Sequence, residues 1–277
     1  MIKKILVSLD GSSYSKAVVE YSFWLSEGFG AQLTGLHVVD IVALEGPFIH
    51  DLSGSLGFEP FLNFSTKMRE VLEANGKTIL ENFKKDCGNA GVPCETLLSF
   101  GIVSNEICEK SRLSDLVVIG RRGVNVGFEY GILGSATEGV VRKSQRPVFI
   151  APAAFNAPRN PLLCYDGSPN STKAMHQAAE FSKTLALPLT VITALKGTDG
   201  ERVLNEARDY VAPYSIGARF VRTDDEPPYS MEGYYRENSH DLVFIGATRH
   251  SRLGEMVLGS TAEHLMRAVD GPFFLVR

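Results

Sequence analysis

Two stretches of the sequence decide the fold: LVSLDGS at residues 6–12 and LLCYDGS at residues 162–168. Two further pairs of blocks recur in the same order: DLVVIG at 115–120 with DLVFIG at 241–246, and PVFI at 147–150 with PFFL at 272–275. Three matching blocks in one order indicate an internal duplication. The offset between copies falls from 156 residues to 126, so the second copy lacks 30 residues between its first two blocks.

The repeat divides the 277 residues into a first domain at 1–152, a linker at 153–160 and a second, shorter domain at 161–277. The linker consists mostly of small and polar residues without periodicity, and it contains a proline. A length of roughly 150 residues per domain is ordinary, and such a domain buries a core without disulfides or metals.

Each copy alternates short apolar runs with longer stretches of helical spacing. The runs in the first copy are rich in Val, Ile and Leu, as strands covered on both faces are, and lie at 4–9, 32–39, 94–99, 115–120 and 147–151. The helical stretches between them lie at 14–28, about 67–88, 102–113 and 134–145. This order predicts an α/β protein made of two tandem doubly wound domains, each with a five-stranded parallel sheet.

Composition excludes several classes of protein. With 44% hydrophobic and 22% charged residues, the chain is typical of soluble globular proteins. A formal net charge of −4 offers no overall basic face for nucleic acid. The first apolar run stops at Asp10, too early for a signal peptide, and no stretch approaches the ~18 apolar residues of a membrane helix. We therefore predict a cytoplasmic protein with no membrane or nucleic-acid partner.

The cysteines and histidines predict neither a disulfide framework nor a CxxC or HExxH metal site. The four cysteines are scattered without a CxxC pair, and the six histidines form no HExxH motif. The stretch 41–64 occurs only in the first copy and is rich in glycine and aromatic residues. It suits a lid over a site, a surface for a partner, or packing against the other domain, and the sequence leaves these alternatives open.

A glycine-containing loop follows the fourth predicted strand of the first copy. Gly120-Arg121-Arg122-Gly123 is followed by ten residues and then by Gly134-Ser135, which opens a helix. Glycines allow a close approach of the backbone, and helix N-terminal amides attract anions, so phosphate is the natural ligand. The two arginines add positive charge. The alternative is a plain turn in which Ser135-x-x-Glu138 forms a capping box.

The second copy repeats this loop. Gly246-Ala247-Thr248-Arg249 is followed by nine residues and then by Gly259-Ser260-Thr261. Helix capping alone does not require the upstream loop to recur, so the recurrence favours binding.

An aspartate ends the first strand of each copy, Asp10 and Asp166. In doubly wound sheets ligands bind at the carboxyl ends of the strands flanking the switch point, here strands one and four. Polyphosphate repels a carboxylate, so each aspartate is predicted to accept from a sugar hydroxyl or base amine, or to hold a divalent cation. The alternative is a helix start, with Ser168 as N-cap and Pro169 at the first helical position.

With these loops the sequence resembles the universal stress protein family in its tandem form, over nearly the whole chain. The family pattern is an Asp at the end of strand one and Gly-x2-Gly-x9-Gly-Ser/Thr after strand four, and members that keep it bind ATP. The resemblance implies a strand order of 3-2-1-4-5, as in adenine nucleotide alpha hydrolase-like folds. It also implies pairing of the two copies through their last strands, and ATP or AMP as ligand, with or without Mg²⁺.

Carried over to this chain, Asp10 lies at the adenosine end, the backbone at Val38 and Val39 reads adenine, and the glycine loop holds phosphates. The predicted nucleotide-binding residues are Asp10, Val38, Val39, Gly120, Arg121, Arg122, Gly123, Gly134, Ser135 and Ala136 in the first copy, and Asp166, Gly246, Arg249, Gly259, Ser260 and Thr261 in the second.

Both copies depart from the pattern. The first has ten residues where the family has nine, and the second has Arg249 in place of the second glycine. An arginine there either blocks the approach of phosphate or replaces amide contacts with a charged fork. We rank the first copy slightly ahead for its glycines and keep the second as a competitor.

No catalytic group is evident. The chain lacks the GxxxxGK[ST] and GxSxG motifs, and Asp10 has no visible partner to orient it as a base. The leading hypothesis is a stress-response regulatory or protective protein that binds adenine nucleotide without efficient turnover, at most with slow ATP hydrolysis. The alternative is a nucleotide-free interaction module with degenerate loops. The protein partner and a homodimer through other faces stay open.

Overall fold

The computed structural model describes residues 2–40, 61–124, 132–223, 227–246, 248–250 and 256–277. The strands of the first copy are β1 (Lys4–Ser8), β2 (Gln32–Asp40), β3 (Cys94–Gly101), β4 (Leu116–Gly120) and β5 (Val148–Ala151). Its helices are α1 (Ser15–Phe29), α4 (Phe61–Ala90), α5 (Val103–Lys110), the 3₁₀ turn η1 (Ser111–Leu113) and α6 (Ser135–Lys143). Strands and helices alternate as the sequence predicts.

The second copy repeats this order with shorter elements. Its strands in the main sheet are β6 (Pro161–Cys164), β7 (Leu189–Thr193), β8 (Ala218–Arg222), β9 (Leu242–Gly246) and β12 (Phe273–Val276). Its helices are α7 (Pro169–Thr184), α8 (Gly197–Val211), the 3₁₀ turn η2 (Ala212–Tyr214), α9 (Tyr229–Glu237) and α10 (Ser260–Ala268). A small antiparallel hairpin, β10 (Thr248–His250) and β11 (Met256–Leu258), follows β9.

Within the described residues, both copies contribute to one ten-stranded sheet of order β3-β2-β1-β4-β5-β12-β9-β6-β7-β8. The predicted order 3-2-1-4-5 is confirmed in the first copy, and the second copy repeats it. Neighbouring strands within each copy run parallel, whereas β5 and β12 pair antiparallel, with Phe149 opposite Phe274. The prediction that the two copies pair through their last strands is therefore confirmed.

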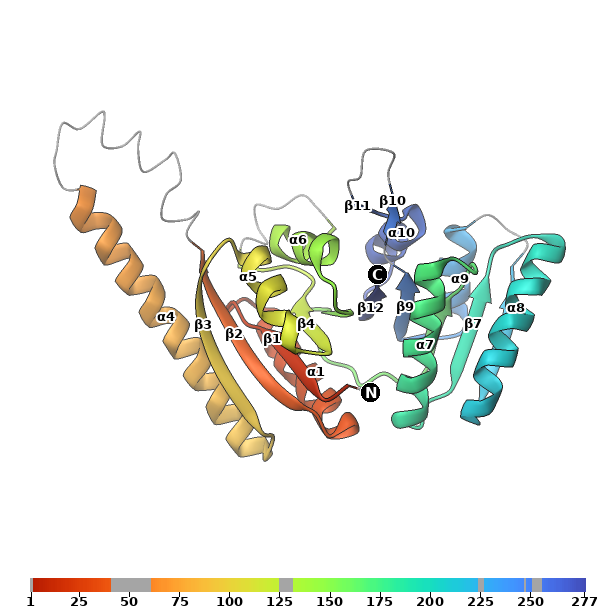
Figure 1. Cartoon of the computed structure of the whole chain (residues 1–277), viewed down its shortest axis with the longest axis horizontal. Coiled ribbons are helices and arrows are strands. Elements are labelled where there is room, and N and C mark those ends of the chain that lie inside the picture. Colours follow the sequence, from red (N-terminus) through yellow and green to blue (C-terminus); the bar gives the residue numbers. More distant parts are fainter. Residues whose placement is uncertain (1, 41–60, 125–131, 224–226, 247, 251–255) are drawn as a thin grey trace.

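Helices cover both faces of this sheet (Figure 1). The core on one face is built from α1, α4, α7 and α8, and the core on the other face from α5, α6, α9 and α10. Each core cluster contains buried residues from both copies. The two halves therefore share one hydrophobic core on each side of the sheet.

We call the contact between the copies the seam, formed by β5 and β12 together with the neighbouring parts of α1 and α7. Phe181 of α7 is its central aromatic residue, 1% exposed. Its ring centroid lies 5.8 Å from Trp24 and 5.4 Å from Phe29, both on α1. The same ring packs on Phe244 and Phe274 of its own copy at 5.1 and 5.8 Å.

The two copies differ most in the second helix. In the first copy α4 has 30 residues, against 15 in its counterpart α8, and it begins before the predicted 67. Figure 1 shows its first turns extending beyond the ends of β2 and β3. Residues 41–60 make up most of the insertion for which a lid, a partner surface and packing against the other domain were the alternatives, and they lie outside the described residues.

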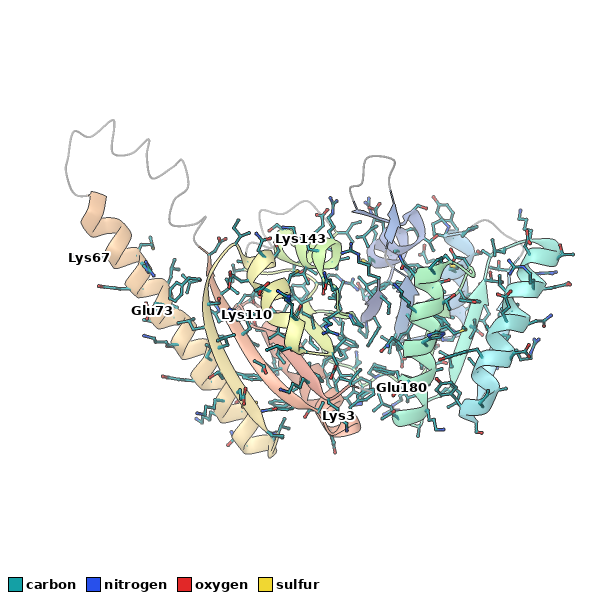
Figure 2. The ribbon with its side chains drawn as sticks, viewed as in Figure 1. Lys3, Lys67, Glu73, Lys110, Lys143 and Glu180 are labelled. Atoms are coloured by element: carbon teal, nitrogen blue, oxygen red, sulfur yellow. The ribbon has the colours of Figure 1, made fainter. Side chains whose placement is uncertain are left out.

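Charged side chains of both signs are distributed over the outer surface, for example Lys67 and Glu73 on α4 (Figure 2). Within the part of the chain that the structure describes, no helix is long and apolar enough to cross a membrane.

The start of the second copy is fixed by a buried histidine. The Nδ1 of His240 lies 2.9 Å from the carbonyl oxygen of Asn160, and its ring stacks on Tyr234 with centroids 5.5 Å apart. The carboxylate of Asp241 accepts hydrogen bonds from the backbone N–H groups of Arg159 and Asn160. Burial lowers the pKa of His240, so its imidazole is held neutral.

This burial predicts an acid-sensitive contribution to stability. The unfolded histidine takes up a proton below about pH 6.5, whereas the folded one resists it, so the contribution is present above that pH and lost as pH falls. We expect His240→Leu to reduce the loss of unfolding free energy between about pH 7.5 and about pH 5.5, measured by urea titration. Leu113→Ala is the control: Leu113 is 85% exposed and carries no titratable group, so its replacement should leave the difference unchanged. An identical pH dependence in His240→Leu and the parent would contradict the prediction.

Candidate functional site

The carboxyl ends of β1 and β4 lie side by side, because these strands pair in parallel. At the end of β1, Asp10 begins a tight turn in which its Oδ1 accepts hydrogen bonds from the N–H of Ser12 and the hydroxyl of Ser15, each at 2.9 Å. Gly11 between them has φ +74°, which a glycine adopts without strain. The turn therefore holds the Asp10 carboxylate in a fixed position.

The glycines after β4 pack directly against this turn. A Cβ atom added at Gly123 would lie 2.8 Å from Oδ2 of Asp10, and one added at Gly120 would lie 2.9 Å from Cβ of Tyr14. A side chain at Gly123 would displace the Asp10 carboxylate, and one at Gly120 would press on the side chain of Tyr14. The predicted residues Asp10, Gly120 and Gly123 are thus brought together, as their positions on strands one and four require.

Helix α6 begins beside the same loop. Its N-cap is Gly134, which provides no side-chain hydrogen bond to the first turn. The N–H of Gly134 donates to the carbonyl of Arg121 at 2.9 Å, and the hydroxyl of Thr137 donates to the carbonyl of Gly120 at 2.8 Å. These two bonds fix the start of α6 to the end of β4.

The predicted capping box at Ser135 and Glu138 is wrong. Ser135 is the first residue of α6 rather than its N-cap, since the extended residue before the helix is Gly134. The same holds for α10, whose N-cap is Gly259, so Ser260 opens the helix and Thr261 follows it. By contrast α7 starts as predicted: Ser168 accepts from the N–H of Ser171 at 3.3 Å, and Pro169 is the first helical residue.

Val38 and Val39 lie near the end of β2, the neighbour of β1 in the sheet. Val39 is buried and Val38 is half-buried, so the backbone is what this segment offers a ligand. The adjacent His37 places its Nδ1 2.8 Å from the carbonyl oxygen of Leu9, which ties the ends of β1 and β2 together.

The side chain of Arg121 binds to the second copy and not to the glycine loop. Its guanidinium donates across the seam to the carbonyl oxygens of Val269 at 3.0 Å and Gly271 at 2.7 Å, and it lies 5.5 Å from the ring centroid of Phe273. Burial lowers the pKa of Arg121, but arginine titrates so far above neutrality that the group stays charged. The structure therefore uses Arg121 to join the copies.

Arg122 also lies at the junction of the copies. It lines a cavity of about 380 Å³ between α6 and α10, together with Leu133 and Glu138 from the first copy and Leu258 and Glu263 from the second. Ala136, in the first turn of α6, is half-buried, and Ser135 beside it is exposed.

The second copy repeats the aspartate turn but not the whole arrangement. Oδ1 of Asp166 accepts from the N–H of Ser168 at 2.9 Å, and Gly167 has φ +75°. Although burial acts in the opposite direction, the hydrogen bonds from Ser168 and Ser171 hold the pKa of the Asp166 carboxyl below its usual range. A Cβ atom at Gly246 would lie 2.7 Å from the backbone of Ser171. Arg249 lies in β10, and its side chain is outside the described residues.

Sequence reasoning missed the residues that support this site. Tyr14 packs on Gly120, Thr137 anchors α6, and Ser12 and Ser15 hold Asp10. An Asp followed by Ser at two and five positions is a signal of such a turn that could have been used. In the described residues, no group of three metal-ligating side chains gathers, so any cation here would need ligands from the bound molecule.

The fold and the loops define a class of α/β protein with two doubly wound units paired edge to edge, each with a glycine-started helix beside an aspartate turn. The model of the Universal stress protein family matches residues 1–152 and 198–277. The chain belongs to this family.

Some of the similar proteins match both copies, and others match about half of the chain. The chain is 25% identical to the universal stress protein Slr1230 of Synechocystis over 287 residues, which cover 100% of both chains. It is 30% identical over 152 residues to the universal stress protein YxiE of Bacillus subtilis, covering 54% of this chain and 99% of the relative. The crystal structure of a universal stress protein from Archaeoglobus fulgidus superposes with a TM-score of 0.78 over 98% of this chain and 97% of that one, at 20% identity. That likeness concerns the fold.

Proposed function

We propose that the first copy binds an adenine nucleotide, ATP or AMP, at the carboxyl ends of β1 and β4, and that the protein acts in the stress response by binding rather than by efficient turnover. One observation carries the proposal: α6 starts at Gly134 without a capping side chain, next to a loop whose glycines lie against the Asp10 turn. First-turn amides that lack a cap are donors for phosphate oxygens.

Each part of the nucleotide has a group of matching chemistry. The first-turn amides of Ser135 and Ala136 suit phosphates. The Asp10 carboxylate suits a ribose hydroxyl, since it accepts hydrogen bonds and is fixed by its own turn. The backbone near Val38 and Val39 suits the edge of adenine. Mg²⁺ bound to the phosphates would reduce their repulsion of Asp10.

One position favours the first copy over the second as the nucleotide site. Gly123 lets the Asp10 carboxylate approach the loop, whereas the second copy has Arg249 at the corresponding place. Occupancy of the first copy has a direct route to the second, because Arg121, which directly follows β4, is hydrogen-bonded across the seam. We propose that nucleotide binding acts on this contact and so on the surface offered to a partner.

The test is calorimetric titration of the full chain with ATP and with AMP, with and without Mg²⁺. We expect saturable binding in the micromolar range, about −8 kcal/mol. Gly123→Arg, which introduces the residue of the second copy, should abolish it, because a side chain at this position displaces the Asp10 carboxylate from its turn. Gly88→Arg is the matched control: a Cβ atom there meets nothing within 4 Å, so binding should persist.

The same samples test turnover. ADP formation at the ~1–100 per second of kinases would contradict binding without efficient turnover. The absence of any binding heat from a chain with an intact circular dichroism spectrum would instead support the nucleotide-free interaction module.

A further inference from the structure

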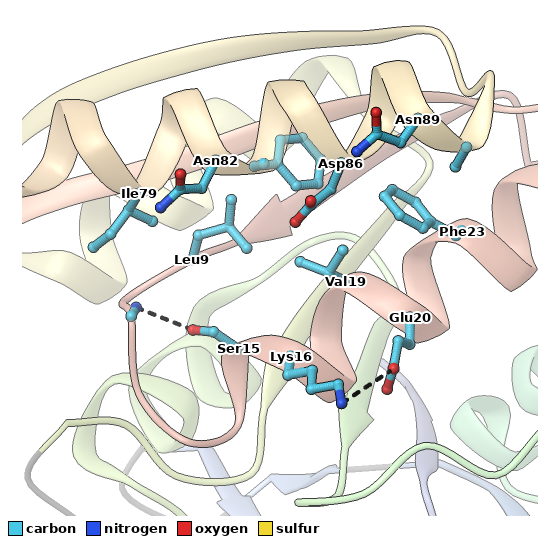
Figure 3. A pocket seen from close by; sticks show the side chains of 13 residues that line it. Leu9, Ser15, Lys16, Val19, Glu20, Phe23, Ile79, Asn82, Asp86 and Asn89 are labelled. Atoms are coloured by element: carbon cyan, nitrogen blue, oxygen red, sulfur yellow. Dashed lines mark hydrogen bonds and ion pairs between the residues drawn. The ribbon is translucent and has the colours of Figure 1, made fainter.

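A groove on the first copy lies apart from the glycine loop, between α1 and α4 (Figure 3). We call it the α1–α4 groove. It has a volume of about 610 Å³, and its floor is apolar, formed by Leu9, Val19, Phe23, Ile79 and Phe83. Volumes of this size and linings of this kind are typical of sites for small molecules. The groove includes Gly11 and Ser15 of the aspartate turn but none of the glycines after β4.

Two of the six polar side chains in its lining are acidic, one is basic and three are neutral. Glu20 lies on α1 and Asp86 on α4. Lys16 is the basic residue of the lining; it is 4.0 Å from Glu20 and its side chain is 85% exposed, which is a weak ion pair. Asp86 forms no hydrogen bond or ion pair with another residue of the described chain, and Figure 3 shows its carboxylate pointing toward α1. The groove therefore offers negative charge above an aromatic floor.

The second copy shows the equivalent place in a filled form. Val203 of α8 would meet a Cβ atom at Gly167, as Ile79 of α4 would at Gly11, which aligns the two helices. By this alignment and the offset of α1 to α7, Glu20, Asp86 and Ala90 correspond to His176, Tyr210 and Tyr214. Phe23 and Phe83 correspond to Ala179 and Ala207, so the aromatic rings stand at different positions in the two copies.

These counterparts contact one another across α7, α8 and η2. The rings of His176 and Tyr210 stack with centroids 4.4 Å apart and planes 22° apart. The hydroxyls of Tyr210 and Tyr214 are 2.9 Å apart, and the ammonium of Lys183 lies 5.8 Å from the centroid of Tyr214. Between these helices the second copy thus holds aromatic rings and a cation of its own.

We infer that the α1–α4 groove of the first copy binds a small organic cation with a planar aromatic ring, such as an aromatic amine. The ring would lie on Phe23, which is half-buried, whereas Phe83, with its ring centroid 6.4 Å away, is 2% exposed and belongs to the core. The ammonium would lie beside the carboxylate of Asp86, since Glu20 is turned to Lys16. An anionic ligand of the same shape is disfavoured by the two carboxylates.

The test uses three probes with one indole ring: tryptamine as the cation, tryptophol as the neutral analogue and indole-3-propionate as the anion. Each is titrated into the full chain by calorimetry in excess ATP, so that a nucleotide site does not take up the probe. We expect saturable binding of tryptamine, weaker binding of tryptophol and none of indole-3-propionate. Asp86→Asn should weaken tryptamine by about fivefold, the effect of an exposed ion pair, and leave tryptophol unchanged.

Two further variants make the test specific. Glu81→Gln removes an exposed carboxylate from the same helix outside the groove and should change nothing. The double variant Asp86→Tyr with Ala90→Tyr introduces the residues of the second copy and should abolish binding of all probes while the unfolding midpoint is retained. The proposal is overturned if tryptamine shows no saturable binding in the millimolar range, or if it binds the folded double variant as well as the parent.

Discussion

Replacing Phe181 with alanine is expected to lower the free energy of unfolding by about 3–5 kcal/mol, the usual cost of removing a buried phenylalanine. The ring is 1% exposed and packs on aromatic residues of both copies. Its loss leaves a cavity at the seam that the paired strands cannot collapse into, because β5 and β12 are fixed by their hydrogen bonds.

Urea unfolding measures this effect with two probes. Trp24 is the sole tryptophan of the chain and lies 5.8 Å from Phe181, so its fluorescence reports the seam, while circular dichroism reports the whole fold. Leu113→Ala is the control, since Leu113 is 85% exposed and its loss should cost less than about 0.5 kcal/mol. A loss below about 1 kcal/mol for Phe181→Ala would show that the two copies do not share a core as described.

Arg121→Met is expected to cost about 2–4 kcal/mol, although methionine keeps much of the apolar stem. The substitution removes the donor from two carbonyl oxygens, those of Val269 and Gly271, and the cation from the ring of Phe273. Arg121→Lys keeps the charge but not the planar fork that reaches two acceptors, so we expect an intermediate loss.

The same urea titration checks this prediction. Arg112→Met is the matched control: Arg112 pairs with Glu109 at the surface with its side chain 69% exposed, and its loss should cost less than about 0.5 kcal/mol. Equal unfolding midpoints for Arg121→Met and Arg112→Met would contradict an energetic role of Arg121 at the seam.

The sequence predicts the fold well because the signals are repeated and local. Strand positions follow from apolar runs that appear twice, so the run at 115–120 corresponds to β4 (Leu116–Gly120) within one residue. Helix ends are less well predicted. The predicted helix at 102–113 ends as an α-helix at Lys110 and continues as a 3₁₀ turn, and no pattern of apolar residues marks that change.

The candidate site is predictable in its residue types but not in its details. Asp10, Gly120 and Gly123 lie on strand ends that the topology must bring together. Whether Ser135 or Gly134 is the N-cap of α6 depends on the backbone angles at these two residues, and the sequence permits either arrangement. The partners of Arg121 are carbonyl groups 148 and 150 residues away. Every residue has a backbone carbonyl, so the sequence does not show which carbonyls will accept from Arg121. An arginine beside glycines is therefore easily assigned to phosphate instead.

The antiparallel pairing of β5 with β12 joins two units that a linker of a few residues keeps in one chain. In a symmetric pair of identical subunits every substitution appears twice, so both sites must change together. Fusion into one polypeptide fixes the ratio of the units at one to one and removes that constraint. Each half then accumulates changes independently, which is how one can retain Gly123 while the other carries Arg249.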